Sequence, residues 1–259
     1  NIFIQGANMK LIVAKNTEEM AKLSAKQAAD VLNAAIEKKG SARLLLSTGA
    51  SQLEFFKEFV KQKVEWHKVE IFHLDEYVGI SPDHPASFNN YLTKRFVEKV
   101  LPGKVHLICG LDDPFKTIEK LTALVNEREI DLGMIGIGEN AHIAFNDPPA
   151  DFNDPRSYKI VTLAPRCLQQ QVGEGWFKSV DETYKQAISM TCPQIMKCEH
   201  IICVVPYKVK AEAIYKTFTS EISEEVPATL LKKHADTTIW CDPDSASGLS
   251  RDVIEKYSD

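Results

Sequence analysis

The chain has 259 residues, of which 44 % are hydrophobic and 26 % are charged, and its formal net charge is −5. This composition is typical of a folded globular protein and excludes a disordered or collagen-like chain. The 31 basic residues form no dense run, so the charge pattern argues against a nucleic acid or an anionic membrane as partner.

The chain carries none of the usual marks of secretion, membrane insertion or a zinc site. No apolar stretch reaches the length of a membrane span, and no signal peptide is recognisable, so we expect a cytoplasmic protein. Residues 1–8 look like the remnant of a protease site from an expression vector, with Met9 as the native start. The cysteines show no CxxC pair and are expected to be reduced core thiols: Cys109, Cys167, Cys192, Cys198, Cys203 and Cys241.

The first half of the chain alternates between apolar strands and helical patterns. After a short apolar segment at 10–13, a helical pattern runs from the cap at 16–19 to about Lys39, where Gly40 stops it. Further strands are expected at 42–47, 69–74 and 130–137, and further helices at 53–63, 87–100 and 114–125.

The second half continues the alternation, with strands expected at 158–163, 186–190, 201–205 and 237–241 and a helix at 208–217. This order predicts an α/β fold with a single doubly wound, mostly parallel sheet, Rossmann-like, with helices on both faces. The absence of repeats and linkers predicts one domain over residues 9–259. The segment 147–182, rich in Pro, Asn, Asp, Gln and Gly, is a candidate active-site lid.

Polar residues follow three of the expected strands, and a doubly wound sheet brings such ends to one edge. The first set, the 47–51 turn, offers hydroxyls, a glycine and a helix N-terminus, which together suit a phosphate: Ser47, Thr48, Gly49, Ala50 and Ser51. An ordinary capped turn is an equally good interpretation, because the segment is neither a Walker motif nor a dinucleotide fingerprint.

The second set is Asp75 and Glu76, directly after an apolar strand, where partial desolvation suits a general base. The alternative is a solvated strand end. The third is His142, which follows Gly136 and Gly138 and precedes Asp147 by five residues, so that this carboxylate could orient it as a proton shuttle. A lone histidine is more often structural.

Two segments, 74–79 (Leu-Asp-Glu-Tyr-Val-Gly) and 136–148 (Gly-Ile-Gly-Glu-Asn-Ala-His-Ile-Ala-Phe-Asn-Asp-Pro), resemble the signature segments of the glucosamine-6-phosphate deaminase (isomerase) family. Further similarity lies at 47–51, at 208–213 and at 227–234. The resemblance therefore extends over nearly the whole chain from Met9 onward.

The resemblance implies an enzyme of amino sugar metabolism. It would convert glucosamine or galactosamine 6-phosphate into a ketohexose 6-phosphate and ammonia, without a metal or an organic cofactor. Asp75 would be the base that moves the proton between C2 and C1, and His142 would open the sugar ring. Asn140 and Asp147 would orient the imidazole of His142, and Lys210 would reach the substrate phosphate. The implied partner is a small-molecule sugar phosphate, with no nucleic acid and no membrane. A homo-oligomer is one of the options left open.

The sequence departs from the family pattern at four positions. Asn140 stands where many relatives have Asp, Asp147 replaces Glu, and Ala141 replaces Gly. Gly175 stands where relatives carry a phosphate-binding arginine, and Arg166, from the same segment, is the candidate substitute for that arginine. These changes put the substrate in question more than the reaction class.

Two alternatives to the deaminase remain. A 6-phosphogluconolactonase would share the fold and the Gly-x-Gly-x-x-x-His segment, although the 75–77 and 146–148 strings favour the isomerase. A non-catalytic sugar-phosphate sensor is suggested by Asn140 and Gly175, whereas Asp75 and His142 argue against it.

Overall fold

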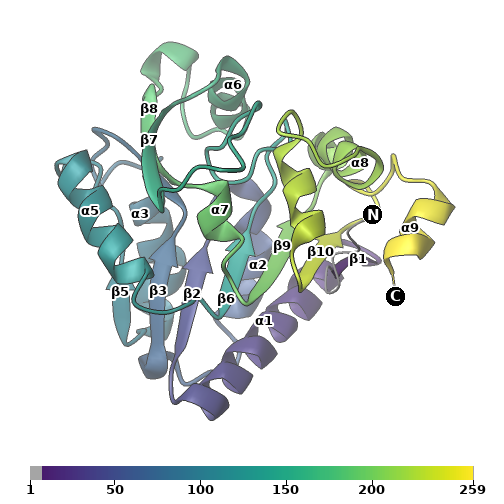
Figure 1. Cartoon of the computed structure of the whole chain (residues 1–259), viewed down its shortest axis with the longest axis horizontal. Helices are drawn as coiled ribbons and strands as arrows, with labels where there is room; N and C mark the ends of the chain where they lie inside the picture. The colour runs from purple at the N-terminus through teal and green to yellow at the C-terminus, as the bar shows by residue number, and fades with distance from the viewer. Residues whose placement is uncertain (1–7, 259) are drawn as a thin grey trace.

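The computed structural model describes residues 8–258 (Figure 1). The expression-vector remnant expected at 1–8 lies outside the described residues, apart from Asn8. The strands are β1 (Met9–Val13), β2 (Ala42–Leu46), β3 (Val69–His73), β4 (Asp75–Tyr77), β5 (Lys104–His106), β6 (Leu132–Ile135), β7 (Tyr158–Thr162), β8 (Gln186–Met190), β9 (His200–Val205) and β10 (Thr237–Cys241). The helices are α1 (Thr17–Lys39), α2 (Leu53–Phe59), α3 (Phe88–Leu92), α4 (Glu98–Val100), α5 (Pro114–Val125), α6 (Pro165–Gly173), α7 (Cys192–Ile195), α8 (Ala211–Thr219) and α9 (Arg251–Tyr257).

The central sheet has seven strands in the order β1-β10-β9-β6-β2-β3-β5, and all of its neighbours run parallel. The chain moves outward from β2 to β3 and β5, then returns to place β6 on the other side of β2. The boundary between β2 and β6 is therefore the point where the strand order reverses, which is where open α/β sheets bind ligands. The predicted doubly wound parallel sheet is confirmed.

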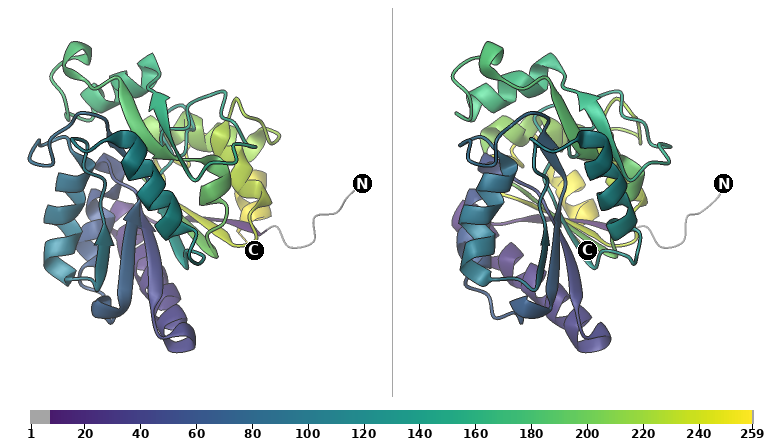
Figure 2. Two further views of the ribbon diagram at one scale, coloured as in Figure 1. Left: turned by 60° about the vertical axis from the view of Figure 1, so that its left-hand side comes forward. Right: turned by 90° about the vertical axis from the view of Figure 1, so that its left-hand side faces the viewer.

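The sheet is covered by helices on both faces (Figure 2). Because successive strand side chains point to opposite faces, Leu44 and Leu46 pack with the core under α1 and α2, whereas Leu45 packs on the other face with α5, α7 and α8. Burial on both faces explains why these strands are continuous apolar runs. A fully buried leucine contributes about 2 kcal/mol relative to an exposed one.

Helix α1 shows how local signals set the boundaries of an element. Asn16 caps it by accepting a 2.8 Å hydrogen bond from the Glu19 N–H, and Gly40 ends it with a φ of 80° while its N–H donates to Ile36. Both signals are readable in the sequence, and the predicted helix is confirmed.

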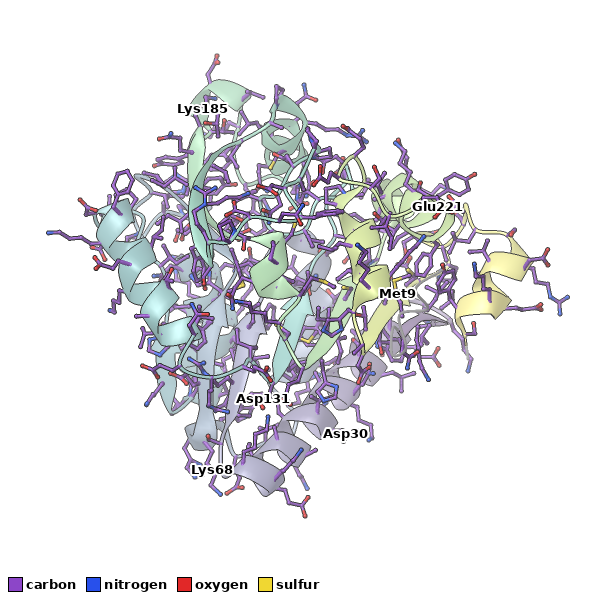
Figure 3. The ribbon with its side chains drawn as sticks, viewed as in Figure 1. Met9, Asp30, Lys68, Asp131, Lys185 and Glu221 are labelled. Atoms are coloured by element: carbon purple, nitrogen blue, oxygen red, sulfur yellow. The ribbon has the colours of Figure 1, made fainter. Side chains whose placement is uncertain are left out.

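A second, three-stranded sheet was not predicted from the sequence. Its order is β4-β8-β7, and both pairs are antiparallel. A single residue, Leu74, separates β3 from β4, so the chain leaves the parallel sheet at Asp75 and pairs with β8. In Figure 3 this sheet, with Lys185 at its tip, rises above the carboxyl ends of the parallel strands, whereas Lys68 and Asp131 mark the opposite end.

The segment 147–182 contains β7, α6 and a short 3-10 helix at Val180–Glu182, so it is more regular than its composition suggests. Its role as a lid, and the single domain over 9–259, stay predictions. Within residues 8–258 no helix is long and apolar enough to cross a membrane. The six cysteines are free thiols, and five of them are buried.

Candidate active site

The three polar strand ends open into one cavity, which we call the site cavity. It encloses about 520 Å³, including its open mouth. The residues after β2 (Ser47, Thr48, Gly49 and Ser51), Asp75 after β3, and Gly136, Gly138 and His142 after β6 all line it, together with Lys210. Segments far apart in the sequence thus meet at the point where the strand order reverses.

The 47–51 turn brings polar groups and the start of a helix to the site cavity. Gly49 has a φ of 107°, a backbone conformation that favours glycine, and Ala50 begins a short 3-10 helix (Ala50–Gln52) that leads directly into α2. The buried hydroxyl oxygen of Ser47 has no hydrogen-bond partner among the described residues. Lys210, only 3 % exposed, reaches the same cavity from the start of the α8 region.

The neighbouring acids Asp75 and Glu76 have different environments. Asp75 faces the site cavity, and burial, followed by the charge of Glu76, raises its pKa well above the usual range. Glu76 instead supports the start of α3, because its Oε2 accepts hydrogen bonds from Ser87 Oγ (2.7 Å) and Asn89 N (2.9 Å). Asp75 is therefore the acid available to a ligand.

His142 is held by its neighbours in a defined orientation. Its Nδ1 lies 3.0 Å from Asp147 Oδ1, and the Asn140 side chain both donates to that oxygen (2.9 Å) and accepts from the His142 N–H (3.2 Å). The ring lies against Gly138, where an added Cβ would come within 2.3 Å of Nε2. Only glycine leaves room for the imidazole there.

Asp147 and Asn140 support His142 from behind, since neither lines the site cavity. Burial alone would raise the pKa of Asp147. The hydrogen bond and charge of His142, with further hydrogen bonds from Asn140 and the Ala164 N–H, outweigh burial and lower that pKa to about 2. The carboxylate therefore stays ionised and fixes the imidazole, as orienting acids do.

The turn before His142 is closed by a hydrogen bond and holds Ala141 in a left-handed conformation. Ala141 has a φ of 65°, in the left-handed region, and its N–H donates to Gly138 O at 2.9 Å. The substitution of alanine for glycine therefore adds local strain and leaves the turn closed.

The sequence did not single out the polar side chains that α6 contributes. Gln170, Gln171 and Glu174 line the site cavity. Gln170 and Gln171 precede Glu174 by four and three residues, a helical spacing that was readable in the sequence. Arg166, the candidate substitute for the arginine at Gly175, is outside the cavity on the surface, 3.4 Å from Glu212.

Within residues 8–258, one group of side chains has a spacing that could suit a metal: His142, Asp147 and Cys167, whose ligand atoms lie within 4.8 Å of one another. Asp147 is already bonded to His142, and burial raises the pKa of the Cys167 thiol, which disfavours the thiolate that a metal requires. A hydrogen-bonded imidazole accounts for the group better than a metal centre.

The fold and the site define an α/β protein in which a carboxylate, an imidazole and a glycine-containing turn face one cavity at the topological switch point. Residues 15–240 match the family model described as glucosamine-6-phosphate isomerases/6-phosphogluconolactonase, and the chain belongs to this family. It is 34 % identical over 249 residues to a glucosamine-6-phosphate deaminase of Thermoanaerobacter pseudethanolicus, covering 92 % of this chain and 94 % of the relative. A Geobacillus sp. deaminase is 33 % identical, covering 96 % of this chain and 100 % of the relative.

Solved structures agree with this assignment. A monomeric glucosamine-6-phosphate deaminase matches with a TM-score of 0.86 and 28 % identity, over 93 % of this chain and 100 % of the other. A 6-phosphogluconolactonase from Trypanosoma brucei matches with a TM-score of 0.75 and 10 % identity, over 94 % and 99 % of the two chains. At that identity the lactonase likeness concerns the fold alone.

Proposed function

We propose that this chain is an enzyme that isomerises and deaminates a hexosamine 6-phosphate, giving a ketohexose 6-phosphate and ammonia. The observation that carries the proposal is the meeting of Asp75, His142 and the 47–51 turn in one cavity. A fixed anion anchor beside two proton-transfer groups supplies both positioning and acid–base catalysis. The deaminase relatives at 33–34 % identity support the same reaction.

In the proposed mechanism His142 serves the ring oxygen when the sugar opens to its aldehyde form. Asp147 and Asn140 hold the imidazole for this step. A carboxylate within 3.0 Å of the other ring nitrogen fixes the orientation and stabilises the protonated ring as it forms.

Asp75 then removes the proton from C2, and the electron pair of that C–H bond forms a double bond between C1 and C2. The aldehyde oxygen at C1 takes up a proton at the same time, which gives an enolamine. Returning the proton to C1 gives the ketose imine, and water hydrolyses its C=N bond to release ammonia. The raised pKa of Asp75, caused mainly by burial, makes its ionised form a stronger base than an exposed carboxylate.

The sugar's phosphate would bind between the 47–51 turn and Lys210. Backbone N–H groups and a buried ammonium suit an anion there. We propose a sugar phosphate as the natural ligand, with no nucleic acid or membrane partner, and the cytoplasm as the place of action. A homo-oligomer stays an option that the proposal leaves open.

The test is an ammonia-release assay with glucosamine 6-phosphate and galactosamine 6-phosphate, run beside hydrolysis of 6-phosphogluconolactone. We expect ammonia from at least one hexosamine phosphate and no lactone hydrolysis above the spontaneous rate. Binding of both sugars without ammonia release would contradict the enzymatic proposal and favour a sensor. Lactone hydrolysis alone would favour the other activity in the family's description.

A further inference from the structure

The anion-binding turn of the site cavity is occupied by a carboxylate of the chain itself. Glu174, at the end of α6, places its Oε2 3.4 Å from the Ala50 N–H and accepts a 2.9 Å hydrogen bond from Trp176 Nε1. Its Oε1 accepts a 2.8 Å hydrogen bond from Gln170 Nε2. An internal anion therefore holds a position that a phosphate would need.

The buried cation of the same cavity is only loosely paired with this carboxylate. Lys210 Nζ lies 4.0 Å from Glu174 Oε1, beyond hydrogen-bond distance, and the lysine side chain is 4 % exposed. The Ser47 hydroxyl and Gln171 Oε1, both buried and both lining the cavity, have no hydrogen-bond partner among the described residues. A ligand that bonds to these groups would satisfy what Glu174 leaves unsatisfied.

The backbone on both sides of Glu174 consists of glycine. Glu174 lies between Gly173 and Gly175, and an added Cβ at either glycine would meet nothing within 4 Å. Gly175 has a φ of 82°, which favours glycine. The wide range of backbone angles open to glycine on both sides of Glu174 allows this segment to adopt other conformations.

We propose that Glu174 is a specificity-determining residue whose carboxylate occupies the anion site and must leave it before a ligand's phosphate can bind. The carboxylate and a phosphate compete for the Ala50 N–H and for Lys210, and two like charges cannot share them. The apparent affinity for phosphate is thus the intrinsic affinity multiplied by the fraction of molecules in which Glu174 has left the site. The phosphate ligand rests on the proposed function, whereas the competition applies to any phosphate.

Competition makes charged and neutral ligands respond differently to the loss of this carboxylate. A phosphate gains affinity when Glu174 is neutralised, because its competitor is gone. A neutral sugar can donate a hydroxyl hydrogen bond to the carboxylate and gains nothing. A purely structural role for Glu174 predicts weaker binding of both ligands.

The experiment measures the Kd of inorganic phosphate by calorimetry at constant ionic strength for the wild type, Glu174→Gln and Glu174→Ala. We expect at least tenfold tighter binding in both variants. The matched control is Glu182→Gln, which removes the same charge from an exposed site in the same segment and is expected to change Kd less than twofold. Circular dichroism verifies folding, and the alanine variant serves if the glutamine variant fails to fold.

Unchanged or weaker phosphate binding in the folded Glu174 variants would overturn the inference, as would an equal gain in Glu182→Gln. The result is separable from the proposed function, because inorganic phosphate binding needs no turnover. If the wild type releases no ammonia while the Glu174 variants bind phosphate tenfold more tightly, the proposed function fails and the competition stands. If the wild type releases ammonia and the Glu174 variants bind phosphate no more tightly, the proposed function stands and the competition fails.

Discussion

The two ends of the parallel sheet differ in how completely their buried polar and charged groups are paired. At the amino end, Arg43 is fully buried, and its guanidinium donates to Glu70 Oε2 (2.9 Å) and to the Leu124 carbonyl (2.6 Å). Asp131 accepts hydrogen bonds from the Arg43 N–H and from Lys39 Nζ, both at 2.6 Å. The charged groups of this network are paired with one another or with backbone carbonyls.

At the carboxyl end, buried polar groups are incompletely paired. The Ser47 hydroxyl and Gln171 Oε1 have no hydrogen-bond partner among residues 8–258, and Lys210 faces its carboxylate at 4.0 Å. Unsatisfied buried groups cost stability, so their concentration at one end of the sheet indicates a ligand site. Complete pairing thus characterises the amino end of the sheet, and incomplete pairing characterises the carboxyl end, where we propose that the ligand binds.

The largest expected effect comes from Asp75→Asn. We expect turnover to fall at least about 10³-fold, because the base is removed. Burial raises the pKa of Asp75 above its unfolded value, so ionisation costs stability as pH rises above the ordinary range of Asp. The variant should therefore also unfold at a higher temperature at pH 7, as measured by thermal denaturation beside the ammonia assay.

The matched control is Glu76→Gln, which changes the neighbouring acid that supports α3. Its turnover should fall far less than that of Asp75→Asn, because the Glu76 charge raises the pKa of Asp75 less than burial does. The variant should lose about 1–2 kcal/mol of stability, because one buried hydrogen-bond acceptor is removed. Equal turnover in Asp75→Asn and the wild type would remove Asp75 from its proposed role.

At the amino end, Arg43→Met should lower stability and leave turnover unchanged, the reverse of the expectation for Asp75→Asn. Removing one partner of a buried ionic network destabilises a protein by about 3–5 kcal/mol. Turnover per folded molecule should remain that of the wild type, because Arg43 lies at the far end of the sheet from the site cavity. Urea denaturation measures the stability, and kinetics normalised to folded protein measure the turnover. A loss of turnover without a loss of stability would contradict the distinction between the two ends of the sheet. Lys22→Met, at an exposed ion pair, is the control and should change neither.

A smaller effect is expected from Asp147→Asn. The folded pKa of Asp147 is about 2, below its unfolded value, so its ionisation stabilises the fold above about pH 4 and this contribution disappears as pH falls toward 2. The difference corresponds to about 2 kcal/mol at pH 7. The variant should be less stable than the wild type at pH 7 and nearly equal to it near pH 2, as urea titrations at both pH values would reveal. A constant difference would contradict this account.

The smallest effect is expected at Ala141→Gly. Glycine relieves the left-handed strain at a φ of 65°, but it gains freedom in the unfolded chain and removes a buried methyl group, so a net change in stability of no more than about 0.5 kcal/mol is expected. Ala34→Gly, on the exposed side of α1, is the control and should cost about 1 kcal/mol. Destabilisation by both substitutions to the same extent would show that Ala141 is unstrained.

The sequence predicted the parallel sheet because apolar strands and capped helices carry local signals, as Asn16 and Gly40 do for α1. It predicted the convergence of Asp75 and His142 because parallel strands share a carboxyl edge. It could not predict the antiparallel sheet, since the pairing of β4 with β8 depends on contacts between residues more than 100 positions apart. The position of Glu174 likewise depends on how α6 packs over the 47–51 turn.

The most direct measurement is a crystal structure of Asp75→Asn in complex with glucosamine 6-phosphate, in which turnover is blocked and the ligand can accumulate. We predict the phosphate between the 47–51 turn and Lys210, C2 of the sugar within about 3 Å of the side chain at position 75, and the ring oxygen beside His142. A sugar phosphate bound elsewhere on the molecule, or one whose C2 lies far from position 75, would contradict the assignment of this end of the sheet as the catalytic one.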